Sequence, residues 1–284
     1  MLSTDAFFEL VKRVLHRPLN HEQRNCVAAG HNVPLLIIAG PGTGKTTVLV
    51  LRALRHLLVD GMPPESIVIT TFTKKAAQEV RTRWLDWGLP LIEAAKTHPD
   101  LQGTQHQGWL RRVDLNRCMT GTLDSICEEL LSEYRIAGTV PPVLIEGYPA
   151  NQRLLREGLG DAYRQQKDLL DAYLAAYTFE GDPPRTQGEV VKVVRTLVDR
   201  FTHDVVDVAK YRTSAPDTAA KEAVASSYES YRTELAAASQ LDFALLEKAF
   251  LERMRGGELD EAVRSWRAVL VDEYQDTNPL QESI

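Results

Sequence analysis

Three short apolar segments, residues 34–39, 66–70 and 268–272, divide the chain. Each is too short for a helix, shows no strict alternation of polar and apolar residues, and ends in a turn or a polar motif. This pattern is typical of parallel strands that are buried on both faces. Between the first two segments, residues 46–60 carry apolar side chains at helical spacing and are followed by Gly61. The order strand, helix, strand predicts a βαβ unit.

The long interval before the third segment is mostly helical by the same criterion. Amphipathic spacing predicts helices over residues 151–178, 188–201 and 217–238. Residues 86–116 are polar and contain Pro90 and Pro99, which predicts a loop with a short helix. The predicted fold class is therefore α/β, a parallel-sheet domain that carries a mostly helical inserted subdomain. Its predicted bounds are residues 1–118 for the first part of the sheet domain, 119–238 for the insertion and 239–284 for the return.

Composition limits the function without defining it. The 284 residues are 44% hydrophobic and 25% charged, as in soluble globular domains. We expect a cytoplasmic protein without a membrane partner, because no stretch approaches the ~20 apolar residues of a membrane span and none resembles a signal peptide. The net charge of −6 excludes a uniformly basic nucleic-acid binder but allows a local basic groove. The three cysteines have no metal-ligand spacing and are expected to be reduced.

A glycine-rich loop follows the first predicted strand and opens the predicted helix. Its residues are Ala39, Gly40, Pro41, Gly42, Thr43, Gly44, Lys45, Thr46 and Thr47. In a P-loop the glycines let backbone N–H groups approach phosphate oxygens, the lysine reaches the β- and γ-phosphates, and the next hydroxyl ligates Mg²⁺. A structural glycine-rich turn and a Rossmann loop are the alternatives, but the latter needs glycine where Lys45 stands. The loop predicts binding of ATP and Mg²⁺, although Ala39 replaces the glycine of the strict pattern.

An acidic motif ends the third apolar segment, where Asp272 and Glu273 follow residues 269–271. The carboxyl ends of parallel strands meet at one edge of a sheet, so we expect this pair beside the phosphate loop. There Asp272 is suited to hold Mg²⁺, and Glu273 to accept a proton from the attacking water. A solvated acidic turn is the alternative interpretation, whereas a calcium loop would need a glycine that this motif lacks.

Further segments narrow the function. Residues 19–29 precede the first predicted strand, residues 71–77 (Thr-Phe-Thr-Lys-Lys-Ala-Ala) follow the second, residues 241–246 (Leu-Asp-Phe-Ala-Leu-Leu) precede the third, and residues 272–276 read Asp-Glu-Tyr-Gln-Asp. Together with the phosphate loop, this ordered set resembles the UvrD/Rep family of superfamily 1 DNA helicases. The resemblance implies a RecA-like P-loop NTPase domain, 1A, interrupted by a helical domain, 1B. It also implies ATP-driven 3′→5′ movement on single-stranded DNA or at a junction of single-stranded and duplex DNA.

The resemblance also implies roles for individual residues. Gln23 matches a glutamine that reads adenine, and Gln275 matches one that links the γ-phosphate to the DNA-facing surface. The residues that match DNA contacts are Thr71, Phe72, Thr73, Lys74 and Thr122. For Phe72, packing in the core is the alternative to stacking on a base. Lys74 stands where the family often has asparagine. Asp124 stands where it usually has histidine, and is expected to cap a helix instead.

The resemblance implies a second RecA-like motor domain, whose arginines complete the ATP site, and a further strand of the first domain. No such motif follows Asp276 in the 284 residues. An arginine of this kind contributes ~10³–10⁵ in rate. The chain alone is therefore expected to bind ATP, to hydrolyse it very slowly and not to unwind DNA. A non-catalytic nucleotide-binding or regulatory module is the alternative function.

Overall fold

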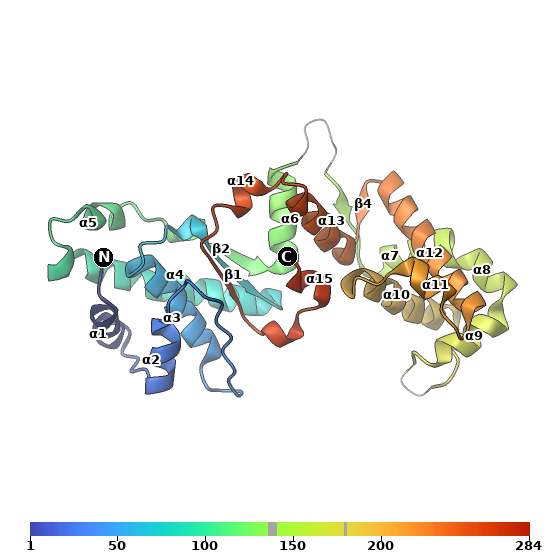
Figure 1. Cartoon of the computed structure of the whole chain (residues 1–284), viewed down its shortest axis with the longest axis horizontal. Helices are drawn as coiled ribbons and strands as arrows, with labels where there is room; N and C mark the ends of the chain where they lie inside the picture. The colour runs from blue at the N-terminus through green and yellow to red at the C-terminus, as the bar shows by residue number, and fades with distance from the viewer. Residues whose placement is uncertain (136–140, 179–180) are drawn as a thin grey trace. The chain divides into compact units, whose positions relative to one another are not determined.

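The computed structural model describes residues 1–135, 141–178 and 181–284, which divide into two compact units (Figure 1). Met1–Ile126 and Leu259–Asp276 form the first unit, and Cys127–Glu258 and Thr277–Ile284 form the second. Each unit has its own hydrophobic core. The predicted α/β class with a parallel sheet is confirmed. The domain bounds at residues 118 and 238 stay predictions.

The first unit is built on a parallel sheet with the strand order β2-β1-β5 (Figure 1). Its strands are β1 (Ile67–Thr71), β2 (Met119–Thr122) and β5 (Ala268–Val271). Its helices are α1 (Thr4–Leu15), α2 (His21–Ala28), α3 (Lys45–Leu58), α4 (Lys74–Lys96), α5 (Gln105–Leu110) and α14 (Asp260–Val263). Short 3₁₀ turns lie at Pro64–Ser66, Pro99–Leu101, Leu115–Arg117 and Tyr274–Asp276. The predicted strands at residues 66–70 and 268–272 and the predicted helix at 46–60 are confirmed, with ends shifted by one or two residues.

The core of the first unit is formed by the sheet with α3 and α4. β1 is buried at all five positions, because it pairs with a strand on each side and apolar side chains cover it. Leu51, Leu54 and Trp84 are buried side chains of this core. The indole N–H of Trp84 donates to the carbonyl of Leu115 at 2.9 Å, so its one polar group is satisfied.

The prediction of a loop over residues 86–116 is wrong for its first part. α4 continues through Pro90 as far as Lys96, and α5 follows after a 3₁₀ turn. A proline inside a helix costs roughly 3 kcal/mol, because it lacks an N–H and clashes with the preceding turn. Trp84, Trp87 and Leu91 are buried on this helix. Burial of a large apolar side chain contributes about 1.5–3 kcal/mol, so these three together offset the cost of the proline.

The prediction of a strand over residues 34–39 is also wrong. These residues have no regular secondary structure, and Leu35, Leu36 and Ile38 are exposed, Ile38 by 90%. A strand exists only where its backbone groups pair with a neighbour. Among the described residues the sheet of this unit contains β2, β1 and β5 alone, with β5 at one edge. Apolar composition predicted the strand but does not supply the neighbour.

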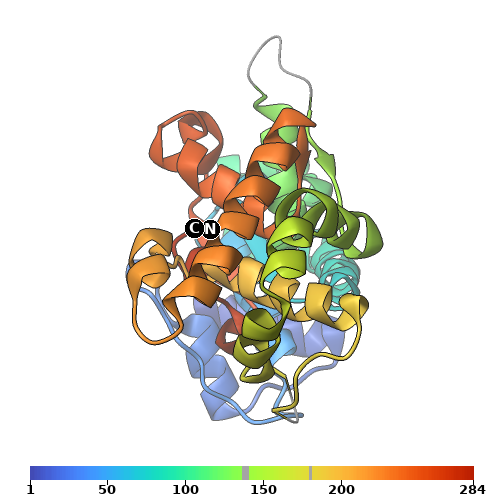
Figure 2. The ribbon, with the colours of Figure 1, turned by 90° about the vertical axis from the view of Figure 1, so that its right-hand side faces the viewer.

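The second unit is mainly helical (Figure 2). Most of its helices contribute buried apolar side chains to one core. Its helices are α7 (Gly147–Arg153), α8 (Gly160–Gln165), α9 (Lys167–Ala175), α10 (Gln187–His203), α11 (Val208–Thr213), α12 (Thr218–Ala237), α13 (Phe243–Arg255) and α15 (Pro279–Glu282). α6 (Leu123–Glu133) begins in the first unit and continues in the second. Two short parallel strands, β3 (Val143–Leu144) and β4 (Gln240–Leu241), pair with each other. The predicted helices at residues 188–201 and 217–238 are confirmed.

The predicted helix over residues 151–178 is interrupted. After α7 the chain forms a π-helical segment, Leu154–Leu159, and then continues as α8 and α9. Gly158 in this segment lies against α12, where a Cβ would come within 2.6 Å of the carbonyl oxygen of Ser227. The hydroxyl of Ser227 donates to the carbonyl of Gly158 at 3.2 Å. The interruption therefore coincides with a close approach of two backbones that only glycine allows.

The reduced state expected of the three cysteines stays a prediction. All three lie in the described ranges and form no disulfide. Burial raises the pKa of Cys118 to about 12, so its thiol stays protonated and unreactive at neutral pH. Among the helices of the described residues, none is long and apolar enough to cross a membrane.

Asp242 connects three helices of the second unit. Its Oδ1 accepts a hydrogen bond from the backbone N–H of Leu245 at 2.8 Å and so caps α13. Its Oδ2 accepts from Arg195 of α10 and from the hydroxyl of Tyr231 of α12, both at 2.9 Å. Arg195 also pairs with Asp199. Asp242 is 2% exposed, and the side chain of Arg195 is 16% exposed. Loss of Asp242 would therefore leave the largely buried guanidinium of Arg195 with less compensating charge.

Asp242→Ala is expected to lower the free energy of unfolding by roughly 3–5 kcal/mol, because it removes the cap of α13 and one partner of a buried ion pair. Urea unfolding followed by circular dichroism measures the change. Asp260→Ala is the control, since the ion pair of Asp260 with Arg264 is exposed and contributes about 1 kcal/mol or less. Equal losses for the two variants would contradict this role of Asp242.

Candidate nucleotide-binding site

The glycine-rich loop has the backbone geometry of an anion site. Gly42 and Gly44 have φ angles of +74° and +86°, in the left-handed region that side chains disfavour. The hydroxyl of Thr43 donates to the carbonyl of Gly40 at 2.7 Å, which closes the loop on itself. Gly44 occupies the N-cap position of α3, and within the described residues no side chain caps this helix. The first N–H groups of α3 are therefore left for another acceptor.

Lys45 and Thr46, at the start of α3, face the acidic motif at the end of β5. The Lys45 ammonium lies 3.8 Å from Oε1 of Glu273, and the Thr46 hydroxyl donates to Oδ2 of Asp272 at 3.2 Å. Asp272 is buried, and its backbone N–H donates to the carbonyl of Thr70 at 2.9 Å, which extends the pairing of β1 with β5. The sheet thus brings together two motifs that are 226 residues apart in the sequence.

Glu273 has an unusual backbone. Its φ of +54° lies in the left-handed region, which costs a residue with a Cβ about 1–2 kcal/mol. Its two carboxylate oxygens have different partners, because Oε1 faces Lys45 while Oε2 accepts from Nε2 of Gln275 at 2.6 Å. Strained backbone of this kind occurs preferentially at functional sites, where neighbouring groups impose it.

The side chains at this edge fit a magnesium nucleotide. Mg²⁺ prefers oxygen ligands, and the Thr46 hydroxyl and the Asp272 carboxylate lie within hydrogen-bond distance of each other beside the loop. Lys45 and the uncapped N–H groups of α3 supply positive charge and hydrogen-bond donors for phosphate oxygens. The side chains of Lys45 and Glu273 are 30% and 40% exposed, so the lysine is accessible to an anion from solvent.

Gln23 lies against the phosphate loop. Its Nε2 donates to the carbonyl of Thr43 at 3.0 Å, and its Oε1 accepts from the backbone N–H of Asn20 at 3.1 Å in a capping box at the start of α2. An amide has two N–H donors and two acceptor lone pairs. One donor and one lone pair of Gln23 therefore remain after these two contacts. Pairing with an adenine edge through two hydrogen bonds needs one donor and one acceptor.

The segment after β1 presents polar and aromatic groups. Phe72 is 56% exposed, so packing in the core does not apply to it. Thr73 caps α4 by accepting from the N–H of Ala76 at 3.1 Å, and Lys74 follows it as an exposed residue. Thr71 is buried, and its hydroxyl donates to the carbonyl of Thr73 at 3.0 Å. An exposed aromatic ring beside a cation is therefore the feature that this segment offers to a ligand.

Thr122, at the end of β2, is buried at 6% exposure. Its hydroxyl donates to the hydroxyl of Ser125 at 3.2 Å, and also accepts from the backbone N–H of that residue at 3.3 Å. The capping role expected of Asp124 thus falls to Thr122, because Asp124 lies inside the first turn of α6 rather than before it. The expectation that Asp124 caps the helix is therefore wrong, because α6 begins one residue before Asp124.

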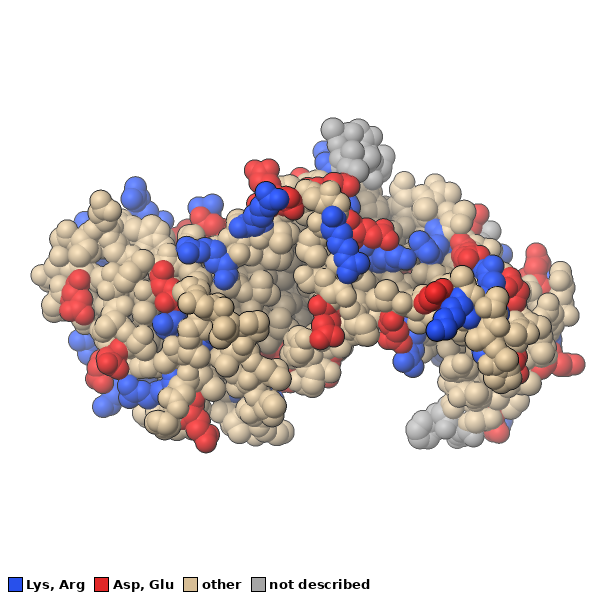
Figure 3. All heavy atoms as spheres, viewed as in Figure 1, with Lys and Arg blue, Asp and Glu red and all other residues tan. Residues whose placement is uncertain are grey.

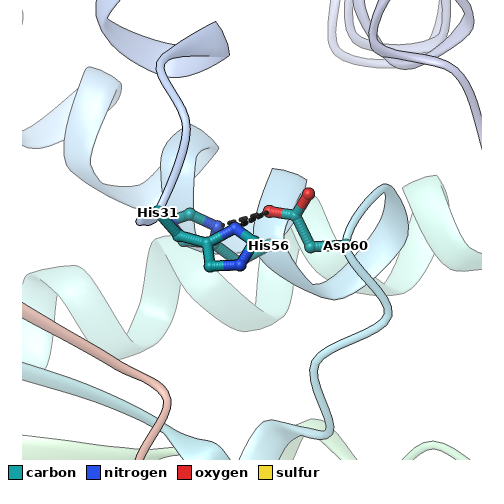
Figure 4. Close-up of side chains that lie close together, drawn as sticks. All are labelled: His31, His56 and Asp60. Atoms are coloured by element: carbon teal, nitrogen blue, oxygen red, sulfur yellow. Dashed lines mark hydrogen bonds and ion pairs between the residues drawn. The ribbon is translucent and has the colours of Figure 1, made fainter. Parts of the chain in front are cut away.

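Sequence reasoning missed a cluster around Asp60, which follows α3. Figure 4 shows the rings of His31 and His56 beside this carboxylate. Oδ2 of Asp60 lies 2.7 Å from Nδ1 of His56, 3.5 Å from Nδ1 of His31 and 2.6 Å from Arg55. The three residues His31, His56 and Asp60 have the ligand types of a metal site. Arg55 already neutralises the same oxygen, however, so we interpret the cluster as a hydrogen-bonded ion pair.

Arg52 of α3 was missed as well. It donates to the backbone carbonyls of Cys26, Ala29 and Gly30 at 2.7–2.9 Å, around the end of α2. One sequence signal existed: Arg52 interrupts an otherwise apolar run, residues 48–54, in the predicted helix. Its partners are main-chain groups, which no residue pattern reveals.

A glycine-rich loop whose lysine and hydroxyl face a strand-terminal carboxylate pair, on a parallel sheet, is the arrangement found in the class of P-loop nucleotide-binding proteins. Comparison with known families gives a narrower class. The family model of the UvrD/REP helicase N-terminal domain matches residues 19–284, and the chain belongs to this family.

Curated relatives agree with this family. The chain is 28% identical over 288 residues to the "ATP-dependent DNA helicase SRS2" of Saccharomyces cerevisiae, which covers 98% of the chain and 21% of that protein. It is 26% identical over 265 residues to the "ATP-dependent DNA helicase srs2" of Schizosaccharomyces pombe, and this alignment covers 93% of the chain and 27% of that protein. It is 25% identical over 269 residues to the "Putative ATP-dependent DNA helicase YjcD" of Bacillus subtilis, and this alignment covers 94% of the chain and 30% of that protein. The chain thus spans less than a third of the length of each.

Phe72→Ala is expected to change the free energy of unfolding by less than about 0.5 kcal/mol, because the ring is largely exposed. Phe7→Ala is the matched control: this ring is fully buried in the core of the same unit, and its loss should cost about 3–5 kcal/mol. Urea unfolding of both variants gives the comparison. A large loss for Phe72→Ala would restore the interpretation of this residue as a core side chain.

Proposed function

We propose that this chain is the ATP- and Mg²⁺-binding motor part of a UvrD-like helicase that moves along single-stranded DNA. The observation that carries the proposal is the contact of the phosphate loop with the acidic motif, Lys45 with Glu273 and Thr46 with Asp272. The relatives named above as ATP-dependent DNA helicases support it. A 3′→5′ direction and a preference for junctions of single-stranded and duplex DNA follow from the family resemblance alone.

The side chains of the site have separate roles in this proposal. Lys45 and the N–H groups of α3 bind the β- and γ-phosphates, while Thr46 and Asp272 hold Mg²⁺. Bound Mg²⁺ would supply positive charge to the phosphates. Glu273 accepts the proton of the attacking water, and its hydrogen bond from Gln275 orients the carboxylate. Arrival of a phosphate beside Lys45 competes with Glu273 for the ammonium, so nucleotide binding frees the base.

The RecA-like identity of the first unit and the need for a second motor domain belong to the same proposal. Two surface features support an additional polypeptide. Val33, Leu36 and Ile38 are exposed by 69%, 68% and 90%, a degree of apolar exposure that is typical of contact surfaces. β5 is at the edge of the described sheet, and its Val269 is 55% exposed, as expected for a strand that could accept another neighbour. Arginines from such a domain would complete the ATP site.

The DNA contact is proposed for the segment that begins at Phe72. A base stacked on an exposed aromatic ring contributes about 1–3 kcal/mol, and the adjacent Lys74 suits a phosphate. Acidic and basic side chains are interspersed over the face drawn in Figure 3, in keeping with the net charge of −6. Attraction to DNA therefore depends on local contacts rather than on the overall field. Thr71 and Thr122 have weaker support as contacts, because both are buried.

Lys45→Ala is expected to weaken ATP binding at least tenfold, because the lysine of a P-loop is the cation that reaches the β- and γ-phosphates. Titration of a fluorescent ATP analogue in the presence of Mg²⁺ measures the affinity. Lys192→Ala is the control, since this lysine is exposed on α10 of the second unit. Unchanged affinity in Lys45→Ala would refute the nucleotide site. Tight binding without any DNA-stimulated hydrolysis after addition of the remaining motor domain would favour a non-catalytic regulatory module.

Phe72→Ala is expected to weaken binding of a polythymidine oligonucleotide by roughly 5–150-fold, the range that corresponds to the loss of one stacked base. Fluorescence anisotropy at fixed salt concentration gives the affinity. Tyr148→Ala is the control, because Tyr148 is an aromatic residue of the second unit that is 75% exposed. Equal effects of the two substitutions would mean that DNA does not use the segment after β1.

A further inference from the structure

The guanidinium of Arg52 joins the two helices that border the phosphate loop. Its Nη1 donates to the carbonyls of Cys26 and Ala29 at 2.8 and 2.7 Å, and its Nη2 donates to the carbonyl of Gly30 at 2.9 Å. These acceptors lie at the carboxyl end of α2, where helix carbonyls have no partner inside the helix. Arg52 itself belongs to α3, whose first residue is Lys45. One side chain therefore links the end of α2 to the helix that begins at the phosphate loop.

Arg52 is a buried cation, so its charge needs compensating groups nearby. The residue is 8% exposed, and burial is the main reason why the pKa of its guanidinium is lowered. The carboxylate of Asp60, which acts on it from a distance, is bonded by Arg55 and His56 instead. The charge of Arg52 is therefore compensated by carbonyl dipoles at a helix carboxyl end, which favour a cation. A planar guanidinium can serve three such acceptors at once, whereas an ammonium cannot match that geometry.

α2 needs this support to hold its position. It has eight residues, and isolated helices of that length are not stable in water. Its amino end is fixed by the capping box of Asn20 and Gln23, and Gln23 contacts the phosphate loop through the carbonyl of Thr43. Its carboxyl end is fixed by Arg52. The place of the Gln23 amide relative to the phosphate loop thus depends on contacts at both ends of a short helix.

We propose that Arg52 is a positioning residue for adenine recognition. Because Arg52 fixes α2 against α3, it holds the remaining donor and acceptor of the Gln23 amide at a constant distance from the phosphate-binding loop. This inference rests on the proposed nucleotide site. Adenine presents an N–H donor beside a ring-nitrogen acceptor, which an amide can pair with simultaneously. Guanine presents two acceptors at the same edge, so an amide held in that orientation repels one of them. Loss of Arg52 therefore lowers the preference for ATP over GTP.

A double-mutant cycle on the 284-residue chain tests the inference. The affinities of fluorescent ATP and GTP analogues are measured for the unchanged chain, Gln23→Ala, Arg52→Ala and the double variant. Each single substitution should reduce the ATP-to-GTP preference about tenfold, the effect of roughly one well-placed hydrogen bond. The double variant should show the same tenfold loss rather than a hundredfold one, because Arg52 acts through Gln23. A roughly hundredfold loss of preference in the double variant would overturn the inference. An unchanged preference in either single variant would overturn it as well.

Two further variants separate positioning from folding. Arg195→Met removes a largely buried, ion-paired arginine of the second unit, so it should lower the midpoint of urea unfolding while leaving the ATP-to-GTP preference unchanged. Arg52→Lys keeps the charge but not the three-acceptor geometry, and should show part of the loss of preference. If Arg52→Ala does not fold, Arg52→Lys decides the matter, and an unchanged preference there would reject the inference.

Lys45→Ala distinguishes failure of the inference from failure of the proposed function. If it weakens both nucleotides while Arg52 has no effect on their ratio, the nucleotide site stands and the role of Arg52 is rejected. If it leaves both affinities unchanged, the proposed site itself is wrong, and the inference falls with it.

Discussion

The pairing of β1 with a parallel strand on each side is the constraint on which the candidate site depends. Val68 lies opposite Met119 on one side and Val269 on the other, so three distant segments end at one edge of the sheet. The N–H of Asp272 still bonds the carbonyl of Thr70, which fixes the acidic motif to the end of β1. A slip of one residue in this register would turn Asp272 to the opposite face of the sheet, away from Thr46.

Charge balance at that edge follows from the register. Lys45 and Gln275 reach different oxygens of the Glu273 carboxylate, and Asp272 accepts from the hydroxyl of Thr46. The two acids therefore have different environments although they are neighbours in the sequence. Asp272 is buried against a hydroxyl, as suits a metal ligand, whereas Glu273 is partly exposed on a strained backbone, as suits a group that exchanges partners. One chain segment can thus supply two distinct functions.

The sequence predicted the elements whose cause is local, and it failed where the cause is tertiary. The strand at residues 66–70 and the loop before α3 follow from apolar runs, glycines and a lysine at fixed spacing. The helix through Pro90 was missed, because burial of its tryptophans outweighs the local cost of proline. The strand predicted at 34–39 is absent, because a strand depends on a neighbour that composition does not encode. Within the site, Lys45 and Asp272 carry motif signatures, whereas the partners of Arg52 are backbone carbonyls.

α3 positions groups beyond its own first turn. α2 is too short to keep its place unaided, and both of its ends are fixed by groups that belong to α3 or to the loop before it. The phosphate contact proposed for Lys45 and the orientation of the Gln23 amide therefore depend on the same helix. The carboxyl end of that element is fixed in turn by Asp60, which accepts from Arg55 and His56. A substitution there, far from any phosphate, would reach the candidate base-reading glutamine through the position of Arg52, because a helix moves as a unit.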